Sequence, residues 1–308
     1  MSEAAQATFP LKFRAAVVRE VESLGLDLLS WRDDGIDIED PAGEQRFVTL
    51  ANLFREISLQ PPEETSDIVH RFMQRVFVAS EDRPAELPET LEAGAERLMI
   101  RVGPPHAEAD NSPWSDFIPG VDDLVLSLVF DYPTMVAYVS KRMMGDSTST
   151  ADAWVQQARL NLYNGTGEGW LQPAYPEFGI FAGNKQDSYD AARALVFHDL
   201  VDKDPAGWLI SLPSRDLLYA RKVEPSGMTH FHMLKVLARD AVAKLPYPIS
   251  DEVYWIRPGV EWVKIPIELT DDRVNIYPPQ ELVDILNIQL GDVPIEIAPV
   301  PAPEAPPS

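Results

Sequence analysis

The sequence predicts an α+β fold with mixed or antiparallel sheets and packed helices, in one or two closely joined lobes. The chain has 308 residues, of which 45% are hydrophobic and 9% aromatic, enough to form a sizeable core. Short apolar runs of strand length alternate with segments at helical spacing. Turn-forming residues, such as Asp-Pro-Ala-Gly at 40–43, separate these segments.

The N-terminal part predicts a helix, three strands and two helices. Apolar side chains fall on one face of residues 12–23, which predicts an amphipathic helix. Short apolar runs bounded by turn residues then predict the strands, and helical spacing returns after them. The predicted strands are 24–31, 35–39 and 45–50, and the predicted helices are 51–57 and 66–76.

The central part contains the most strand-like segment of the chain. Residues 124–130 are apolar on both faces, which predicts a strand in the middle of a sheet. Further strands are predicted at 98–102, 178–182, 208–212 and 217–223, with Pro213 stopping the third. Helices are predicted at 134–144, 151–162 and 191–200, and Asp187 and Asp190 have the spacing of a helix cap and a first-turn carboxylate.

The C-terminal part predicts a long helix at 228–245, ended by Pro246 and Pro248. Strands at 253–257, 260–267 and 273–277 and a short helix at 279–286 follow. This order of one helix, three strands and one helix resembles that of the N-terminal part. Either the two parts are related lobes or the similarity arose by chance. The predicted division is a flexible lead 1–10, an N-terminal lobe 11–80, a central region 81–224, a C-terminal extension 225–292 and a disordered Pro-rich tail 293–308.

The charge balance narrows the class of partner. There are 49 acidic and 26 basic residues, a formal net charge of −23. Such a chain repels phosphate backbones and anionic membranes, so we expect no nucleic-acid and no membrane partner. A basic protein partner or a cationic ligand suits this charge better. The alternative is that the charge serves solubility alone.

Several kinds of chemistry have no support in the sequence. The chain has no cysteine, which excludes disulfides and thiol nucleophiles. His230 and His232 lie two residues apart in a predicted helix and would not share a face, so no metal site is expected. Gly183-Asn184-Lys185 lacks the rest of a phosphate-binding loop, so no cofactor is expected. The first residues do not form a secretory signal, and we expect a cytoplasmic protein. The oligomeric state is left open.

Charged residues at the ends of the central strands are the candidate site. Carboxylates that meet in space can perform acid–base chemistry, and an arginine at a turn can hold an anion. Helix capping and turn formation are the structural alternatives for the same residues. The catalytic candidates are Asp131, Asp190 and Asp216, and the ligand-binding candidates are Tyr189, Arg193, Ser214 and Arg215.

The central region resembles domain-of-unknown-function family 1444, the YtpQ-like bacterial proteins. The resemblance rests on Val129-Phe130-Asp131, on Tyr189–Arg193 and on the Pro-Ser-Arg-Asp turn at 213–216, and it covers roughly residues 122–223. The family pattern has Ser where this chain has Ala192, which argues against a hydroxyl role there. No established activity follows from the resemblance.

These observations favour a non-catalytic binding or interaction protein with an acidic surface. The first alternative is a hydrolase-type enzyme that uses carboxylates together with an anion-binding arginine. The second is an accessory or immunity-type protein that binds a basic partner.

Overall fold

The computed structural model describes residues 9–77, 88, 91–105, 113–132, 135–145, 148–225, 230–270 and 273–290. The predicted tail and most of the predicted lead and of the polar stretch at 79–88 lie outside these residues. The chain divides into two compact units, which are described separately. The N-terminal unit comprises residues 1–89 with 131–137 and 244–247, and the C-terminal unit comprises the rest. The α+β class is confirmed.

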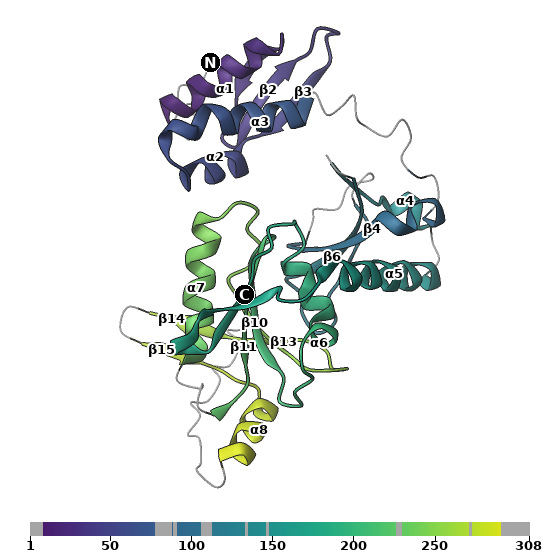
Figure 1. The fold of residues 1–308 in the computed structure, drawn as a ribbon, viewed down its shortest axis with the longest axis vertical. Coiled ribbons are helices and arrows are strands. Elements are labelled where there is room, and N and C mark those ends of the chain that lie inside the picture. The colour runs from purple at the N-terminus through teal and green to yellow at the C-terminus, as the bar shows by residue number, and fades with distance from the viewer. Residues whose placement is uncertain are drawn as a thin grey trace, which may run out of the picture. The chain divides into compact units, whose positions relative to one another are not determined.

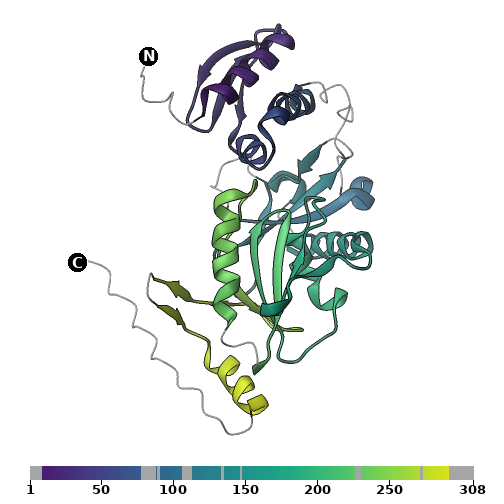
Figure 2. The ribbon, with the colours of Figure 1, turned by 60° about the vertical axis from the view of Figure 1, so that its left-hand side comes forward.

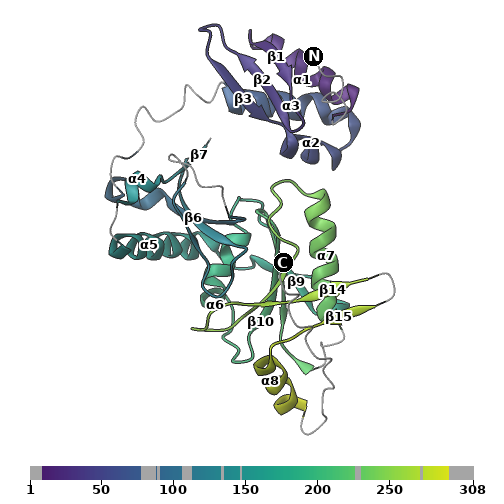
Figure 3. The ribbon, with the colours of Figure 1, turned by 180° about the vertical axis from the view of Figure 1, so that it is seen from behind.

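The N-terminal unit is a three-stranded antiparallel sheet with helices packed against it (Figure 1). The strands have the order β1-β2-β3, and α1 contacts both β1 and α3. Figure 3 shows the same sheet from behind. Its elements are α1 (Leu11–Ser23), β1 (Asp27–Trp31), β2 (Gly35–Glu39), β3 (Gln45–Thr49), α2 (Ala51–Ser58), η2 (Pro62–Glu64) and α3 (Thr65–Phe77).

The amphipathic pattern predicted for this unit forms its core. Val17 and Val21 of α1 are buried against Ile36 and Ile38 of β2 and Val69 of α3. Alternate residues of a strand point to opposite faces, which explains why Ile36 and Ile38 face the helices while Asp37 faces away. The predicted helices and strands of this region are confirmed within two or three residues at their ends.

A six-stranded antiparallel sheet is the centre of the C-terminal unit, with the order β13-β12-β10-β11-β9-β8. Strands β10 and β12 are buried along their whole length. Helix α7 runs alongside this sheet, as Figure 2 shows. The strands are β8 (Leu171–Tyr175), β9 (Ile180–Gly183), β10 (Trp208–Ser214), β11 (Leu217–Lys222), β12 (Val253–Ile256) and β13 (Val263–Ile265), and α7 is Phe231–Lys244.

A smaller sheet has the order β4-β6-β5, with β7 also paired to β6. The central position predicted for residues 124–130 is confirmed, because β6 lies between β4 and β5 and its first six residues are buried. Helix α5 packs on β4, and the side-chain amide of Asn161 donates to the carbonyls of Ala95 and Leu98 at 2.7 Å each. The elements are β4 (Leu98–Gly103), β5 (Ser115–Phe117), β6 (Val125–Asp131), β7 (Val136–Tyr138) and α5 (Thr148–Thr166).

The remaining elements are short. Strands β14 (Ile267–Leu269) and β15 (Val274–Ile276) form a separate antiparallel pair. The predicted strand 260–267 is therefore two strands, β13 and β14, divided at Pro266. The others are η3 (Glu92–Arg97), α4 (Lys141–Met144), η4 (Pro176–Phe178), η5 (Ala191–Val196), α6 (Phe197–Leu200) and α8 (Gln280–Leu290).

Three central predictions were wrong in detail. Residues 134–144 do not form one helix, because β7 pairs with β6 before α4 begins. Pro213 does not stop β10, which continues to Ser214 across an irregularity in its pairing with β11, where a missing N–H costs little. Residues 191–200 form a 3₁₀ helix and a single α-turn, η5 and α6, and every side chain of η5 is buried.

Candidate functional site

Six of the seven predicted site residues gather where β9, the loop 184–190 and the β10–β11 turn meet. The seventh, Asp131, ends β6 in a segment that clusters with the N-terminal unit. At the centre is a group of four side chains, which we call the Asp–Arg cluster: Thr166, Asp187, Asp190 and Arg193.

Arg193 is the hub of the Asp–Arg cluster and is only 1% exposed. Its Nη1 donates to Asp187 Oδ1 at 2.8 Å and to Asp190 Oδ1 at 2.9 Å, and its Nη2 donates to Asp187 Oδ2 at 2.5 Å. Its Nε donates to Thr166 Oγ1 at 3.2 Å. All three guanidinium nitrogens are thus used within the protein, which leaves little donor capacity for a substrate.

Asp190 is fully buried and shapes the loop before it. Its carboxylate accepts the backbone N–H of Lys185 at 3.0 Å and of Gln186 at 2.9 Å. Gln186 has a φ of +57°, a left-handed conformation that costs energy in a residue with a side chain. Asp190 therefore stabilises a strained turn. It precedes η5 without a capping bond and does not lie in its first turn, so the predicted role as a first-turn carboxylate is wrong.

Asp216 does the same for the second strained residue of the loop. Ser188 has a φ of +74°, and its backbone N–H donates to Asp216 Oδ1 at 2.8 Å. The other oxygen, Oδ2, accepts from Arg215 Nε at 3.2 Å and Nη2 at 2.8 Å. Ser214 Oγ accepts the backbone N–H of Asp216 at 3.3 Å. The structural interpretation of this turn, in which Arg215 and Asp216 pair with neighbours, is confirmed.

The two carboxylates on Arg193 have opposite pKa shifts. Burial raises the pKa of Asp190 above its ordinary value, although the N–H groups of Gln186 and Lys185 act against that effect. Burial is the largest single influence on Asp187 and acts to raise its pKa, but the hydrogen bonds and charge of Arg193, the N–H of Tyr189 and the charge of Lys185 together outweigh it, so the net shift is downward. Each shift follows from the packing of a structural ion pair, so neither points by itself to catalysis.

The last ligand-binding candidate, Tyr189, is a core residue. Its side chain is buried, and its ring lies 5.7 Å from the guanidinium carbon of Arg101. His232 lies in α7 and His230 directly before it, and the ring of His230 packs at 5.4 Å from Phe178.

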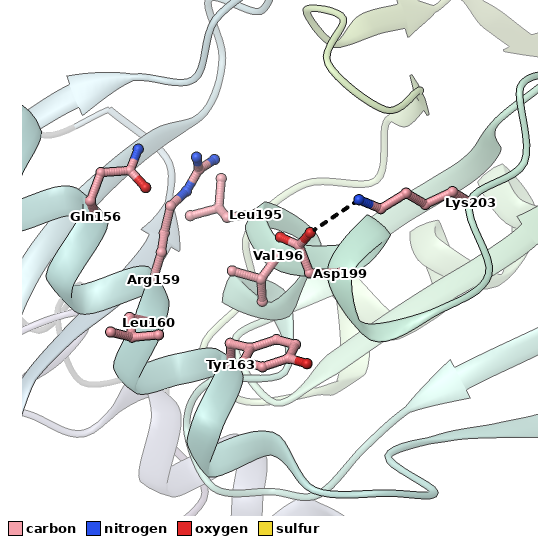
Figure 4. A pocket seen from close by; sticks show the side chains of 8 residues that line it. All are labelled: Gln156, Arg159, Leu160, Tyr163, Leu195, Val196, Asp199 and Lys203. Atoms are coloured by element: carbon pink, nitrogen blue, oxygen red, sulfur yellow. Dashed lines mark ion pairs between the residues drawn. The ribbon is translucent and has the colours of Figure 1, made fainter.

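Sequence reasoning missed a pocket beside the Asp–Arg cluster. It has a volume of about 390 Å³ and lies between α5 and the η5–α6 segment (Figure 4). From α5 come Gln156, Arg159, Leu160 and Tyr163, which have the i, i+3, i+4, i+7 spacing of one helix face. The opposite wall is made by Leu195, Val196, Asp199 and Lys203.

The signal for this pocket was present but mixed. A face that combines Gln, Arg, Leu and Tyr has no clear hydrophobic stripe, so the spacing does not predict burial. Only the packing of α5 through Ala158, Asn161 and Leu162 on its other side leaves this face to line a cavity.

Arg159 is the unusual group of the pocket. Its Nε is buried and has no hydrogen-bond partner among the described residues. Burial lowers the pKa of its guanidinium, and the charge of Asp199 acts in the opposite direction. Asp199 is itself paired with Lys203 at 3.6 Å, the ion pair drawn in Figure 4. The pocket thus contains a cation whose Nε has no acceptor in the part of the chain that the structure describes.

The Asp–Arg cluster positions both walls of the pocket. Arg193 belongs to η5 and donates to Thr166 at the end of α5, so this bond ties the two walls together. The hydroxyl of Thr166 donates in turn to Leu162 O at 2.6 Å. On the far side, Phe197 of α6 packs edge-on against Trp170 at 5.7 Å. Of the predicted site residues, Arg193 is thus the one shown to link the two elements that line the pocket.

Neither a metal-ligand cluster nor a membrane-spanning helix occurs among the residues that the structure describes. No group of three or more His, Asp or Glu side chains there is arranged to hold a metal ion. Within the same residues no helix has both the length and the apolar character needed to cross a membrane.

Comparisons with known proteins give no relative. No family model, no curated protein and no solved structure matches this chain. The resemblance to domain-of-unknown-function family 1444 therefore stays a prediction based on the residues quoted for it.

Proposed function

We propose that this chain is a non-catalytic binding or interaction protein. The observation that supports this most is the use of the candidate carboxylates within the fold. A general acid or base has to come within about 2.6–3.2 Å of the proton that it transfers. Asp190 is buried and its oxygens accept from Lys185, Gln186 and Arg193, while both oxygens of Asp216 accept from Ser188 and Arg215.

The partner in this proposal is a basic protein. The support is the net charge of −23, because a strongly acidic surface attracts cationic partners and accelerates their association. The immunity-type function is one form of this proposal, in which the basic partner is a toxin. We further propose that the chain is a bacterial, cytoplasmic protein of the YtpQ-like family. Its cysteine-free composition agrees with a reducing compartment.

The hydrolase alternative has weaker support. It needs carboxylates that reach a substrate and an arginine that can hold an anionic group. Of its candidate arginines, Arg215 already donates to Asp216, and Arg193 already donates to Asp187 and Asp190.

Substitution of the candidate carboxylates separates the two functions. We expect Asp190→Asn and Asp216→Asn to lower the melting temperature by several degrees, because each removes a charge that holds a strained turn. Asp122→Asn is the matched control, since Asp122 is exposed. Differential scanning calorimetry provides the measurement. Unchanged melting temperatures in all three variants, together with loss of a turnover measured for the wild type, would contradict the proposal.

The partner is tested with the full-length protein. Cross-linking followed by mass spectrometry identifies bound proteins, and titration calorimetry with each purified partner measures affinity at rising salt. We expect a saturable basic partner whose affinity falls as salt screens the attraction. Asp190→Asn, measured below its melting temperature, should retain this affinity. Repeated recovery of acidic partners only, or affinities that do not depend on salt, would refute the choice of a basic partner.

A further inference from the structure

We propose that the pocket between α5 and the η5–α6 segment binds a small carboxylate ligand with an apolar body, and that Arg159 receives the carboxylate. This inference goes beyond the proposed function, because it concerns a small molecule and does not depend on a protein partner. The cavity of about 390 Å³ falls within the range of ligand sites, about 300–1,000 Å³.

The first argument is the unmet hydrogen-bonding capacity of Arg159. Its Nε is shielded from solvent and has no acceptor among the described residues, a state that costs free energy in a charged donor. A carboxylate matches the planar fork of a guanidinium and accepts two parallel hydrogen bonds from its two Nη groups, a contact that compensates the charge without access to the buried Nε. Gln156 lies one turn away on the same face and adds an amide donor at that end.

The second argument is the apolar surface at the other end of the pocket. Leu160 is 52% exposed and Tyr163 is 44% exposed, although both are large side chains. Leu195 and Val196 supply apolar surface on the opposite wall. Arg159 and Tyr163 are four residues apart, which places them about 6 Å apart along the helix axis. This spacing suits a carboxylate attached to a ring or a short branched chain.

The third argument concerns charge. The pocket contains two cations, Arg159 and Lys203, and a single carboxylate, Asp199. Lys203 neutralises Asp199, so the charge that remains is that of Arg159. In a chain with 49 acidic and 26 basic residues, a pocket with a surplus positive charge selects an anion against the overall field.

The test is a titration of the full-length protein with benzoate, in which isothermal titration calorimetry measures the binding. Benzamide has the same shape without the charge, and inorganic phosphate has the charge without the apolar body. We expect saturable benzoate binding, at least about tenfold weaker binding of benzamide, and no displacement of benzoate by phosphate. Absence of saturable benzoate binding at millimolar concentration overturns the proposal, and so does benzamide binding with equal affinity.

Variants connect the binding to the residue. Arg159→Gln should weaken benzoate at least about tenfold, and Arg159→Lys should weaken it by less, because the lysine keeps the charge and loses the fork. The control is Lys222→Gln, which removes an exposed lysine paired with Asp204 and should leave the affinity unchanged. Wild-type affinity in Arg159→Gln overturns the assignment.

Two further measurements guard against misfolding and against a different source of the carboxylate. If Arg159→Gln melts early, Asp199→Asn replaces it as the test, and we expect tighter benzoate binding because the pocket then contains the charges of Arg159 and Lys203 with no opposing carboxylate. A tripeptide ending in a free phenylalanine carboxylate tests whether the ligand is a chain terminus. If it binds more than about tenfold tighter than benzoate, the free small-molecule ligand is refuted.

Discussion

Arg193 and Asp190 show how a single residue pair decides the meaning of a site. Both side chains are buried, so both have lost hydration that would cost several kcal/mol per ion if it were not replaced. Their hydrogen bonds to each other, to Thr166 and to backbone N–H groups replace it. Breaking a pair of this kind lowers the free energy of unfolding strongly, and the pair has few hydrogen-bonding groups left to contact a substrate.

Removal of one partner should therefore expose the cost. We expect Arg193→Met to destabilise the protein by about 3–5 kcal/mol at pH 7, because Asp190 remains as a buried, unpaired charge. Burial already raises the pKa of Asp190 in the folded protein. The folded state therefore loses stability as the pH rises through that pKa and the carboxyl group ionises. Loss of Arg193 raises that pKa further. The deficit should therefore shrink between pH 7 and pH 5, as denaturant unfolding at each pH measures.

An exposed ion pair provides the comparison for that experiment. Lys222→Met removes the partner of Asp204 at the surface and should change stability by less than about 1 kcal/mol. A deficit for Arg193→Met that is as small as this, or that grows on acidification, would show that Asp190 is not a buried charge held by Arg193.

At the scale of elements, strand β9 and the pocket wall are linked through one aromatic residue. Gly183 ends β9, and a Cβ built there would lie 2.8 Å from the ring of Trp170. Trp170 is buried and packs edge-on against Phe197 of α6, the helix that follows η5. We therefore expect a change at the end of this strand to affect the η5–α6 segment through Trp170, because a close-packed interior has little room to absorb it.

This packing leads to a pair of matched substitutions. We expect Gly183→Ala to destabilise the protein by about 1–3 kcal/mol, because the methyl group overpacks the Trp170 ring. Gly103→Ala is the control at the end of β4, where a Cβ would meet nothing within 4 Å, and it should change stability by at most about 0.5 kcal/mol. Chemical denaturation measures both. Equal stabilities for the two variants would show that the strand end tolerates a side chain.

At the scale of the whole molecule, the two units differ in how their cores are assembled. The core of the N-terminal unit is drawn entirely from residues 9–77. The six-stranded sheet of the C-terminal unit joins strands as distant as β8 and β13. Local cores of this kind close with little loss of chain entropy, whereas the larger sheet needs contacts of long sequence separation.

The N-terminal unit should therefore fold without the rest of the chain. We expect a fragment of residues 1–89 to unfold in one cooperative transition, because it retains the complete core of this unit. Val69→Asp in the same fragment is the control, since Val69 is fully buried and a charge there should abolish folding. Circular dichroism during heating distinguishes the two outcomes. A wild-type fragment that shows no cooperative transition would mean that its core depends on the deleted segments.

Local pattern was sufficient for most of the fold. Hydrophobic spacing and turn residues identified the N-terminal helices and strands, the central place of β6 and the strands β10 and β11, because these depend on neighbours close in sequence. The sequence also identified Asp190 and Arg193, which lie three residues apart, as candidate site residues.

The roles of those residues were decided by tertiary structure alone. Asp190 accepts the backbone N–H of Gln186, four residues before it, and Asp216 of the β10–β11 turn accepts that of Ser188. Thr166 accepts a hydrogen bond from Arg193, which lies 27 positions later in the chain. The pocket at Arg159 exists because α5 packs on β4 and leaves its mixed face toward the η5–α6 segment. Hydrophobic patterning records which side of an element is buried. Which polar groups then meet, and which are left without an acceptor, depends on contacts between elements that no local pattern encodes.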